Sequence, residues 1–495
     1  MSVAIKLTFV SVGRMAVALG EQFLLVVTCG GTIFSCGLND VGQLGLSPGV
    51  DTAQQRALPA ATGLNNAIMV SAVKRHAACV NRNGSVYTWG ESVDGRTGVT
   101  PHGRRSRLGP QCVYSVFAGK PPAIMVACGD GHTLLLTAAG HVWGCGSNMH
   151  CQVGVQSMAD PDAIDRSDVT KFTQIPPERF DCGDGRSEIA FIAAGAIHSA
   201  AVGRDDGVLW TWGLGFGGRL GHGIGLLFHS APVPTAIPTV TFGEAIVSAS
   251  ATRTYTMAVT ASGVVWVSGE SPHCAMGLGQ TLACDTFNRV GGPEIFGDGG
   301  VRSVACSIRH SLMLAQNGIL WVCGDPTSFC LGRDTHGERY DTPQDIHADC
   351  FNFEPVLAVS ASLTRSAAVT ASGGLYTWGA ELSGKFNGLC VPSVLTEDVE
   401  TITKYEPQRV RHTGVPHKHI DPFGLWNWPL SPGEQLAFAM GTHPRLGANS
   451  AYQTTNDEML ACILRHARRE PEVADTDVGL RNLLGVGALD GLQRQ

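Results

Sequence analysis

Two glycine-rich stretches have the residue types that bind phosphate groups. GLGFGG, residues 213–218, matches the G-x-G-x-x-G pattern that brings a dinucleotide pyrophosphate to a helix N-terminus. GAELSGKF, residues 379–386, is close to a nucleotide-binding P-loop, but Phe386 stands where Ser or Thr would bind magnesium. Neither stretch leads into a sequence that favours a helix. We therefore interpret both as surface loops and predict no cofactor.

Acidic and cysteine-rich stretches have the residue types that bind metals, but not the spacing. An EF-hand loop that starts at residue 160 would need Gly at its sixth position and Glu at its twelfth, where Asp165 and Lys171 stand. CGSNMHC, residues 145–151, has no partner pair at zinc-like spacing. We predict no metal site, no catalytic residues and no enzyme. The acidic stretch is interpreted as a solvated segment that attracts a basic partner through four aspartates: Asp160, Asp162, Asp165 and Asp168.

A sevenfold repeat must position these segments. The motif is Gly, any residue, aliphatic, aromatic, any residue, then Trp, Cys or Ser, then Gly, as in GSVYTWG from residue 84. Its copies follow one another roughly 55 residues apart, which is the signature of a repeat architecture. The closing glycines are Gly37, Gly90, Gly146, Gly213, Gly269, Gly324 and Gly379.

The repeat predicts the fold. Short apolar runs and small-residue turns precede each motif, so one unit holds about four antiparallel strands, which makes one propeller blade. We predict an all-β, seven-bladed β-propeller over residues 1–410. We expect one of two terminal segments, 3–10 or 405–410, to complete a blade begun at the other end of the chain. Residues 156–188 are interpreted as an insertion that forms a mobile loop at the rim, because Pro176 and Pro177 block strand pairing.

Residues 411–495 lack the repeat and form a second region. Ser431 with Glu434, and Thr455 with Glu458, are capping boxes that predict two short helices. We expect this α-helical tail either to dock on the propeller or to bind a partner as a helix in a groove. The second helix resembles the opening helix of an F-box, which would imply a substrate adaptor for a ubiquitin ligase.

The composition indicates which compartment and which classes of partner are favoured. The net charge of −7 does not favour nucleic acid, chromatin or a membrane surface as direct partners. The sixteen cysteines show no disulfide-like spacing, which is typical of a reducing compartment. We find no clear targeting signal and predict a cytoplasmic or nuclear protein, with a monomer favoured.

Several stretches resemble regulator of chromosome condensation repeats. They are GDGHT (129–133) with GHVWGCGSN (140–148), and CGLNDVGQLG (36–45), and the resemblance extends over residues 17–410. It implies a seven-bladed propeller whose loops gather on two opposite faces. It also implies partner contacts by aspartates and by histidines at one position of the repeat. The residues at that position, here named the column, are Phe23, His76, His132, His198, Tyr255, His310 and Arg365.

The column allows two interpretations. Partner binding would involve His76, His132, His198, His310 and Arg365. The alternative is structural, because a histidine in a tight turn bonds backbone groups. Plant UV-B photoreceptors of the same family carry Trp directly before the column residue, and no Trp stands there in any of the seven repeats.

Members of the family include nucleotide-exchange factors for Ran-like small GTPases, which act through a short acidic wedge directly after the third aromatic strand. At that place stands SNMHCQVG, residues 147–154, which we interpret as an ordinary short loop. The basic N-terminal tail expected for nucleosome binding is also missing from this sequence. We therefore predict a scaffold that binds a protein partner through one loop face of the propeller, with exchange on a small GTPase as the alternative.

Overall fold

The computed structural model describes residues 17–28, 30–46, 55–99, 107–115, 119–155, 165–183, 185, 187–227, 229–279, 281–333, 337–371, 373–379 and 408–409. Of residues 55–61, 107–108 and 408–409 it describes only the backbone. These residues all belong to the first of two compact units, Met1–Asn427. The apolar run 3–10 and the two predicted C-terminal helices lie outside the described residues. Among the described residues, no helix has the length and apolar character needed to cross a membrane.

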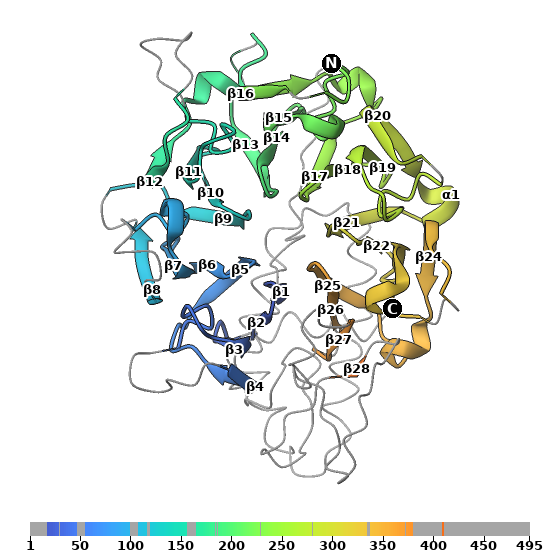
Figure 1. The fold of residues 1–495 in the computed structure, drawn as a ribbon, viewed down its shortest axis with the longest axis horizontal. Coiled ribbons are helices and arrows are strands. Elements are labelled where there is room, and N and C mark those ends of the chain that lie inside the picture. The colour runs from blue at the N-terminus through green and yellow to red at the C-terminus, as the bar shows by residue number, and fades with distance from the viewer. Residues whose placement is uncertain are drawn as a thin grey trace, which may run out of the picture. The chain divides into compact units, whose positions relative to one another are not determined.

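The described strands form seven antiparallel sheets of four strands each, arranged as the blades of a ring (Figure 1). The predicted seven-bladed β-propeller is therefore confirmed. Blade one contains β1 (Val17–Leu19), β2 (Phe23–Val27), β3 (Ile33–Leu38) and β4 (Gln55–Ala61); blade two β5 (Ala67–Val73), β6 (His76–Asn81), β7 (Val86–Glu91) and β8 (Arg107–Tyr114); blade three β9 (Ala123–Cys128), β10 (His132–Thr137), β11 (Val142–Gly146) and β12 (Val169–Gln174); blade four β13 (Ile189–Ala194), β14 (His198–Gly203), β15 (Leu209–Leu214) and β16 (Ser230–Ile237).

The remaining blades follow the same plan. Blade five contains β17 (Ile246–Ala251), β18 (Tyr255–Thr260), β19 (Val265–Glu270) and β20 (Ala283–Gly291); blade six β21 (Val301–Cys306), β22 (His310–Ala315), β23 (Leu320–Gly324) and β24 (Tyr340–Ile346); blade seven β25 (Val356–Ala361), β26 (Arg365–Thr370), β27 (Leu375–Gly379) and β28 (Gln408–Arg409). In the part of the chain that the structure describes, helix is confined to short turns: η1 (Val93–Gly95), η3 (Pro177–Phe180), η4 (Phe216–Gly218), η5 (Thr239–Thr241), α1 (Pro293–Phe296), η6 (Pro326–Ser328) and η7 (Ala348–Phe351).

The ring closes by packing, not by a shared sheet. Each blade is built from strands that follow one another in the sequence, so the expectation of a blade completed from the other terminus is wrong for the described strands. β28 instead pairs with β27 of its own blade. β1 already forms the inner strand of blade one, where it packs on β25 and β26 and its Leu19 N–H donates to Ser360 Oγ at 3.1 Å. Among the described strands, closure therefore uses none that is borrowed from the other end of the chain.

The third strand of each blade carries the motif aromatic at its second position, as expected for seven equivalent copies. Where Trp stands directly before the closing glycine of the motif, its indole N–H reaches the preceding blade. Trp212 Nε1 donates to Gln152 O at 3.0 Å, and Trp89 Nε1 donates to Gln43 O at 2.9 Å. A Cβ on Gly154 would stand only 2.7 Å from Trp212 Nε1. The glycine in the preceding loop is therefore required for this contact between blades.

The predicted insertion is only partly a loop. Residues 169–174 form β12, the outer strand of blade three, and Phe180 of η3 is buried edge-on against Trp210 and Trp212, with ring centroids 5.7 and 5.9 Å apart. The expectation of a mobile segment throughout 156–188 is therefore wrong. Pro177 occupies the first turn of η3, where a missing N–H costs nothing, so the proline pair starts a turn instead of preventing structure.

Candidate functional site

The column residues occupy one structural position. Each of the seven begins the second strand of its blade, from Phe23 in β2 to Arg365 in β26. All are buried; the four histidines are fully inaccessible and Arg365 is 8% exposed. The side chains at this position are therefore enclosed in the propeller and do not face the solvent.

Five column residues bond to a hydroxyl in the next blade, and we call each such bond a latch. The hydroxyl always belongs to the Ser or Thr that directly follows the next column residue. The latches are His76 Nε2 to Thr133 Oγ1 (3.1 Å), His132 Nε2 to Ser199 Oγ (2.8 Å), His198 Nε2 to Thr256 Oγ1 (2.8 Å), Tyr255 OH to Ser311 Oγ (2.7 Å) and His310 Nε2 to Ser366 Oγ (2.7 Å). A sequence signal for the latches exists, because in five blades the column residue is directly followed by Ser or Thr, as the pairs HT, HS, YT, HS and RS. Sequence reasoning missed this signal.

The hydroxyls fix the proton on each histidine. Ser199 Oγ donates to Gln152 O at 2.7 Å, so it can only accept from His132. His132 therefore carries its proton on Nε2. Thr133, Thr256 and Ser366 donate to backbone carbonyls in the same way. Each of the four histidine latches thus ties together a column residue, the next blade and the loop after a third strand.

The histidines are neutral. Burial lowers the pKa of His310 to about 3, and burial together with the charge of the nearby Arg96 lowers the pKa of His132 to about 3. Burial likewise places the pKa of His76 and His198 well below the usual value. A histidine held uncharged in this way is suited to a buried hydrogen bond and not to proton transfer with solvent.

The geometry assigns a structural role to the predicted column sites. His76, His132, His198 and His310 join blades, which matches the structural interpretation of the column. Contact between a partner and these residues or Arg365 stays a prediction. A protein partner would first contact the exposed residues that surround these buried side chains.

The turns between first and second strands and the loops after third strands lie at the same end of each blade. Their backbones bond directly, as in Glu91 N–H to Arg75 O at 3.0 Å. We call this end the loop face. Ion pairs cross between blades there: Lys74 Nζ lies 2.7 Å from Asp130, and Arg75 pairs with Asp40.

The described end of the acidic stretch, residues 165–168, belongs to the loop face of blade three. Because β12 begins at Val169, the loop after the third aromatic strand spans residues 147–168, longer than the matching loops 92–106, 215–229 and 325–339. Sequence reasoning had separated residues 147–154 from the acidic stretch, and the structure joins them in one loop. Asp165 and Asp168 are exposed, and the pKa of Asp168 is raised by partial burial and by the charge of Asp94. Asp160 and Asp162 lie outside the described residues.

The phosphate-loop pattern at residues 213–218 is packed against blade five. A Cβ on Gly218 would lie 2.3 Å from Cys284 O, and one on Gly217 would lie 2.6 Å from the carboxyl carbon of Glu270. The glycines thus accommodate the neighbouring blade. Of residues 379–386, only Gly379 is described, at the end of β27. Within the described ranges, no group of three or more His, Cys, Asp or Glu side chains is arranged to hold a metal ion.

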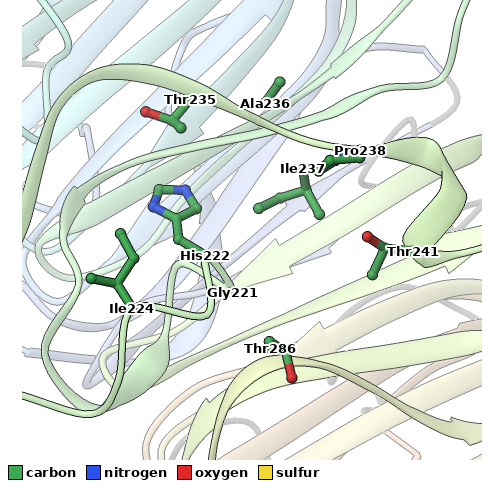
Figure 2. A pocket seen from close by; sticks show the side chains of 9 residues that line it. All are labelled: Gly221, His222, Ile224, Thr235, Ala236, Ile237, Pro238, Thr241 and Thr286. Carbon is green, nitrogen blue, oxygen red and sulfur yellow. The ribbon is translucent and has the colours of Figure 1, made fainter.

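A pocket of about 340 Å³ lies between the outer strands of blades four and five (Figure 2). Its walls include Ile224 from the loop after β15, Thr235 and Ile237 from β16, and Thr286 from β20. His222 also faces the pocket, and its Nε2 bonds Thr211 Oγ1 at 2.9 Å. Burial lowers the pKa of His222 to about 4, so this wall is neutral. Sequence reasoning did not identify this pocket.

Family models match parts of the chain. The model of the regulator of chromosome condensation (RCC1) repeat matches residues 83–136 and 206–259, and a second model of this repeat matches residues 126–151. The solved structure of Prp20p from Saccharomyces cerevisiae superposes with a TM-score of 0.59 at 17% identity, over 81% of this chain and 88% of that chain. Its published description concerns the binding of Prp20p to Gsp1p and histones.

Three curated relatives have different overall lengths. The chain is 26% identical over 349 residues to mouse E3 ubiquitin-protein ligase HERC2, which is 70% of this chain but 7% of HERC2. It is 25% identical over 425 residues to the Arabidopsis thaliana Ultraviolet-B receptor UVR8, covering 86% and 89% of the two chains. It is 29% identical over 218 residues to the Bos taurus Secretion-regulating guanine nucleotide exchange factor, or 42% of each.

Proposed function

We propose that this chain, a seven-bladed propeller of RCC1 repeats, is a non-enzymatic scaffold that binds a protein partner through its loop face. One observation carries the proposal. The residues that recur from blade to blade are buried at the contacts between blades, whereas the loops after the third strands differ in length, charge and exposed side chains. A rigid scaffold with variable loops on one face is suited to selective binding.

Cross-linking with a lysine-reactive reagent tests which face is used. Lys74 lies on the loop face, in the turn between β5 and β6, whereas Lys120 lies at the opposite end, between β8 and β9. The tagged full-length chain, incubated with cell extract, should yield partner cross-links at Lys74 and not at Lys120. Cross-links confined to Lys120, or no partner above that of a tag-only control, would contradict the proposal.

Nucleotide exchange on a Ran-like small GTPase is a second candidate, because the acidic loop 147–168 follows the third aromatic strand directly. Exchange factors of the resembled family carry an acidic wedge at this place, and one curated relative is named as a guanine nucleotide exchange factor. The exposed Asp165 and Asp168 provide acidic groups on this loop.

Release of fluorescent GDP from Ran tests the second candidate. If the loop acts as a wedge, the full-length chain should accelerate release more than about tenfold, and deletion of residues 157–167 should abolish the acceleration. Release at the intrinsic rate with the intact chain would rule out exchange on this GTPase.

A further inference from the structure

The loop after β15 exposes an unusual amount of apolar surface. Its side chains at Phe216, Ile224, Leu226 and Leu227 are 43, 67, 42 and 83% exposed. They are four of the twelve large apolar side chains that are exposed among the described residues, and they fall within one loop. Single exposed apolar residues are common, but a cluster of this kind marks an interaction surface. We call residues 216–227 the apolar loop.

The apolar loop is held in a defined conformation. Gly217 N–H donates to Leu226 O at 2.9 Å, which joins its two ends. Gly223 N–H donates to Asp285 O, and Gly225 N–H donates to Asp285 Oδ2, both at 2.8 Å, which fixes the tip against β20 of blade five. Because these bonds order the loop in advance, a partner would not have to supply the entropy cost of ordering it.

The pocket of Figure 2 lies directly behind the loop, with Ile224 as a shared wall. Its volume of about 340 Å³ is at the small end of ligand pockets, which suits one or two apolar side chains better than a whole small molecule. Hot spots of protein interfaces have this form, with a buried anchor side chain surrounded by residues that exclude water.

The adjacent strand favours docking by side chains. β16 is the outer strand of blade four and carries Pro232 and Pro234, which lack N–H groups. A partner strand could not pair regularly along this edge. An apolar side chain inserted between the loop and β16 needs no such pairing.

The charges beside the loop define the flanks of the partner segment. The half-buried Asp285 carboxylate borders the tip of the loop. Burial lowers the pKa of Arg219 to about 10, and the charge of Glu270 opposes this shift, so these two neighbouring charges largely compensate one another. Arg253 lies in the turn between β17 and β18, at the inner end of blade five, whereas Asp285 lies on the outer strand. The field at the tip is therefore negative and complements a cation.

We infer that the apolar loop and its pocket bind a short linear segment of a protein partner, with one aliphatic or aromatic anchor in the pocket and a Lys or Arg beside it facing Asp285. This inference rests on the proposed scaffold function and specifies its site. Leu282, directly before β20 of the facing blade, adds a further apolar side chain that is 52% exposed.

Phage display on the full-length chain tests the inference without a known partner. Random 12-residue peptides are selected in parallel on the wild-type chain and on Leu227→Asp. The side chain of Leu227 is 83% exposed, so this change leaves the fold intact. Wild-type selection should enrich peptides with an apolar anchor flanked by Lys or Arg, and Leu227→Asp should not.

One enriched peptide, labelled for fluorescence anisotropy, then measures the site directly. Leu227→Asp and Thr235→Trp, which fills the pocket from its exposed rim, should each weaken binding more than about tenfold. Asp285→Asn keeps the acceptor for Gly225 and should weaken binding about threefold while reducing its salt dependence. Phe353→Asn is the matched control: Phe353 is 79% exposed in the connection before β25, and its φ of +61° suits Asn.

Four outcomes would overturn the inference. The first is that enriched peptides bind Leu227→Asp as tightly as wild type, and the second is that the enriched peptides lack the apolar and basic pattern. Sedimentation of the chain with phosphatidylserine vesicles, dependent on Leu227, in the absence of peptide binding would show a membrane contact instead. A partner cross-linked at Lys74 that still binds Leu227→Asp refutes this site and leaves the scaffold function standing.

Discussion

Replacement of His132 tests the idea that neutral histidine latches hold the ring together. The imidazole is fully buried and bonds Ser199 Oγ at 2.8 Å. His132→Ala removes one buried hydrogen bond, worth about 1 kcal/mol, and leaves a cavity that adds about 2 kcal/mol. We expect the free energy of unfolding to fall by about 3 kcal/mol. His132→Gln keeps an N–H donor at similar reach and should recover part of that loss.

The pH dependence of the free energy of unfolding tests more directly whether His132 is buried in its neutral form. Burial lowers the pKa of His132 from 6.5 to about 3, so the folded protein excludes the charged imidazole. The unfolded chain takes up this proton below pH 6.5, and stability is therefore complete above pH 6.5 and is lost as the pH falls toward 3. Linkage gives a slope of about 1.4 kcal/mol per pH unit for each such histidine.

Urea denaturation followed by tryptophan fluorescence between pH 6 and 4.5 is the assay. The free energy of unfolding should fall with decreasing pH in the wild type, and His132→Gln should reduce the slope by about 1.4 kcal/mol per pH unit. Carboxylates that titrate in this range contribute equally to both proteins and cancel in the comparison. Identical slopes would refute the assignment of His132 as a buried neutral histidine.

Four further predictions follow from the packing. Phe180→Ala should lower the free energy of unfolding by about 3 kcal/mol in the same denaturation assay, because its ring is buried against two tryptophans. Deletion of residues 157–167 should leave the thermal midpoint within about 2 °C of the wild type by calorimetry, because residues 165–167 are exposed; a larger drop would show that the loop packs on the ring. Gly129→Ala should strongly reduce the soluble yield, because its Cβ would lie 2.2 Å from Gly195 O, while Gly109→Ala, with nothing within 4 Å, should behave as wild type. Hydrogen exchange should be faster in β2 of blade one, where the column residue Phe23 makes only apolar contacts with blade two, than in β14 of blade four, where His198 forms a latch; equal protection would contradict a stabilising role of the latches.

The sequence predicted the blades because one steric constraint repeats seven times. The closing glycine pairs with the column residue across the second and third strands, as Gly146 does with His132. A Cβ on Gly146 would lie 2.5 Å from His132 Cα, and its φ is +114°. Only glycine satisfies both conditions. The spacing of these glycines therefore predicted the number of blades.

The latches and the binding surface required the structure. His132 and Ser199 lie 67 residues apart, and their contact depends on how two blades pack side by side. Likewise, β12 could not be separated by sequence from the acidic stretch before it, because Val169 and Phe172 are the only apolar residues of VTKFTQ and their spacing of three does not follow the alternation of a strand. The exposed side chains of the apolar loop are separated from one another in the sequence. Their exposure follows from the hydrogen bonds that join the loop to Asp285 in the next blade.

The two contacts beside blade one differ from the other five. In blade one the column residue is Phe23, and Ala77 occupies the hydroxyl position that faces it in blade two; both belong to one apolar cluster. Leu24 occupies the hydroxyl position that would face Arg365, and it packs with Ala367 and other apolar residues of blade seven. A hydrogen bond requires defined distance and angle, whereas apolar packing is non-directional. Of the two contacts without latches, one joins blades seven and one, where the two ends of the propeller sequence meet, and the other joins blades one and two. Blade one is thus held by apolar packing together with hydrogen bonds made outside the column, such as Trp89 Nε1 to Gln43 O and Leu19 N–H to Ser360 Oγ.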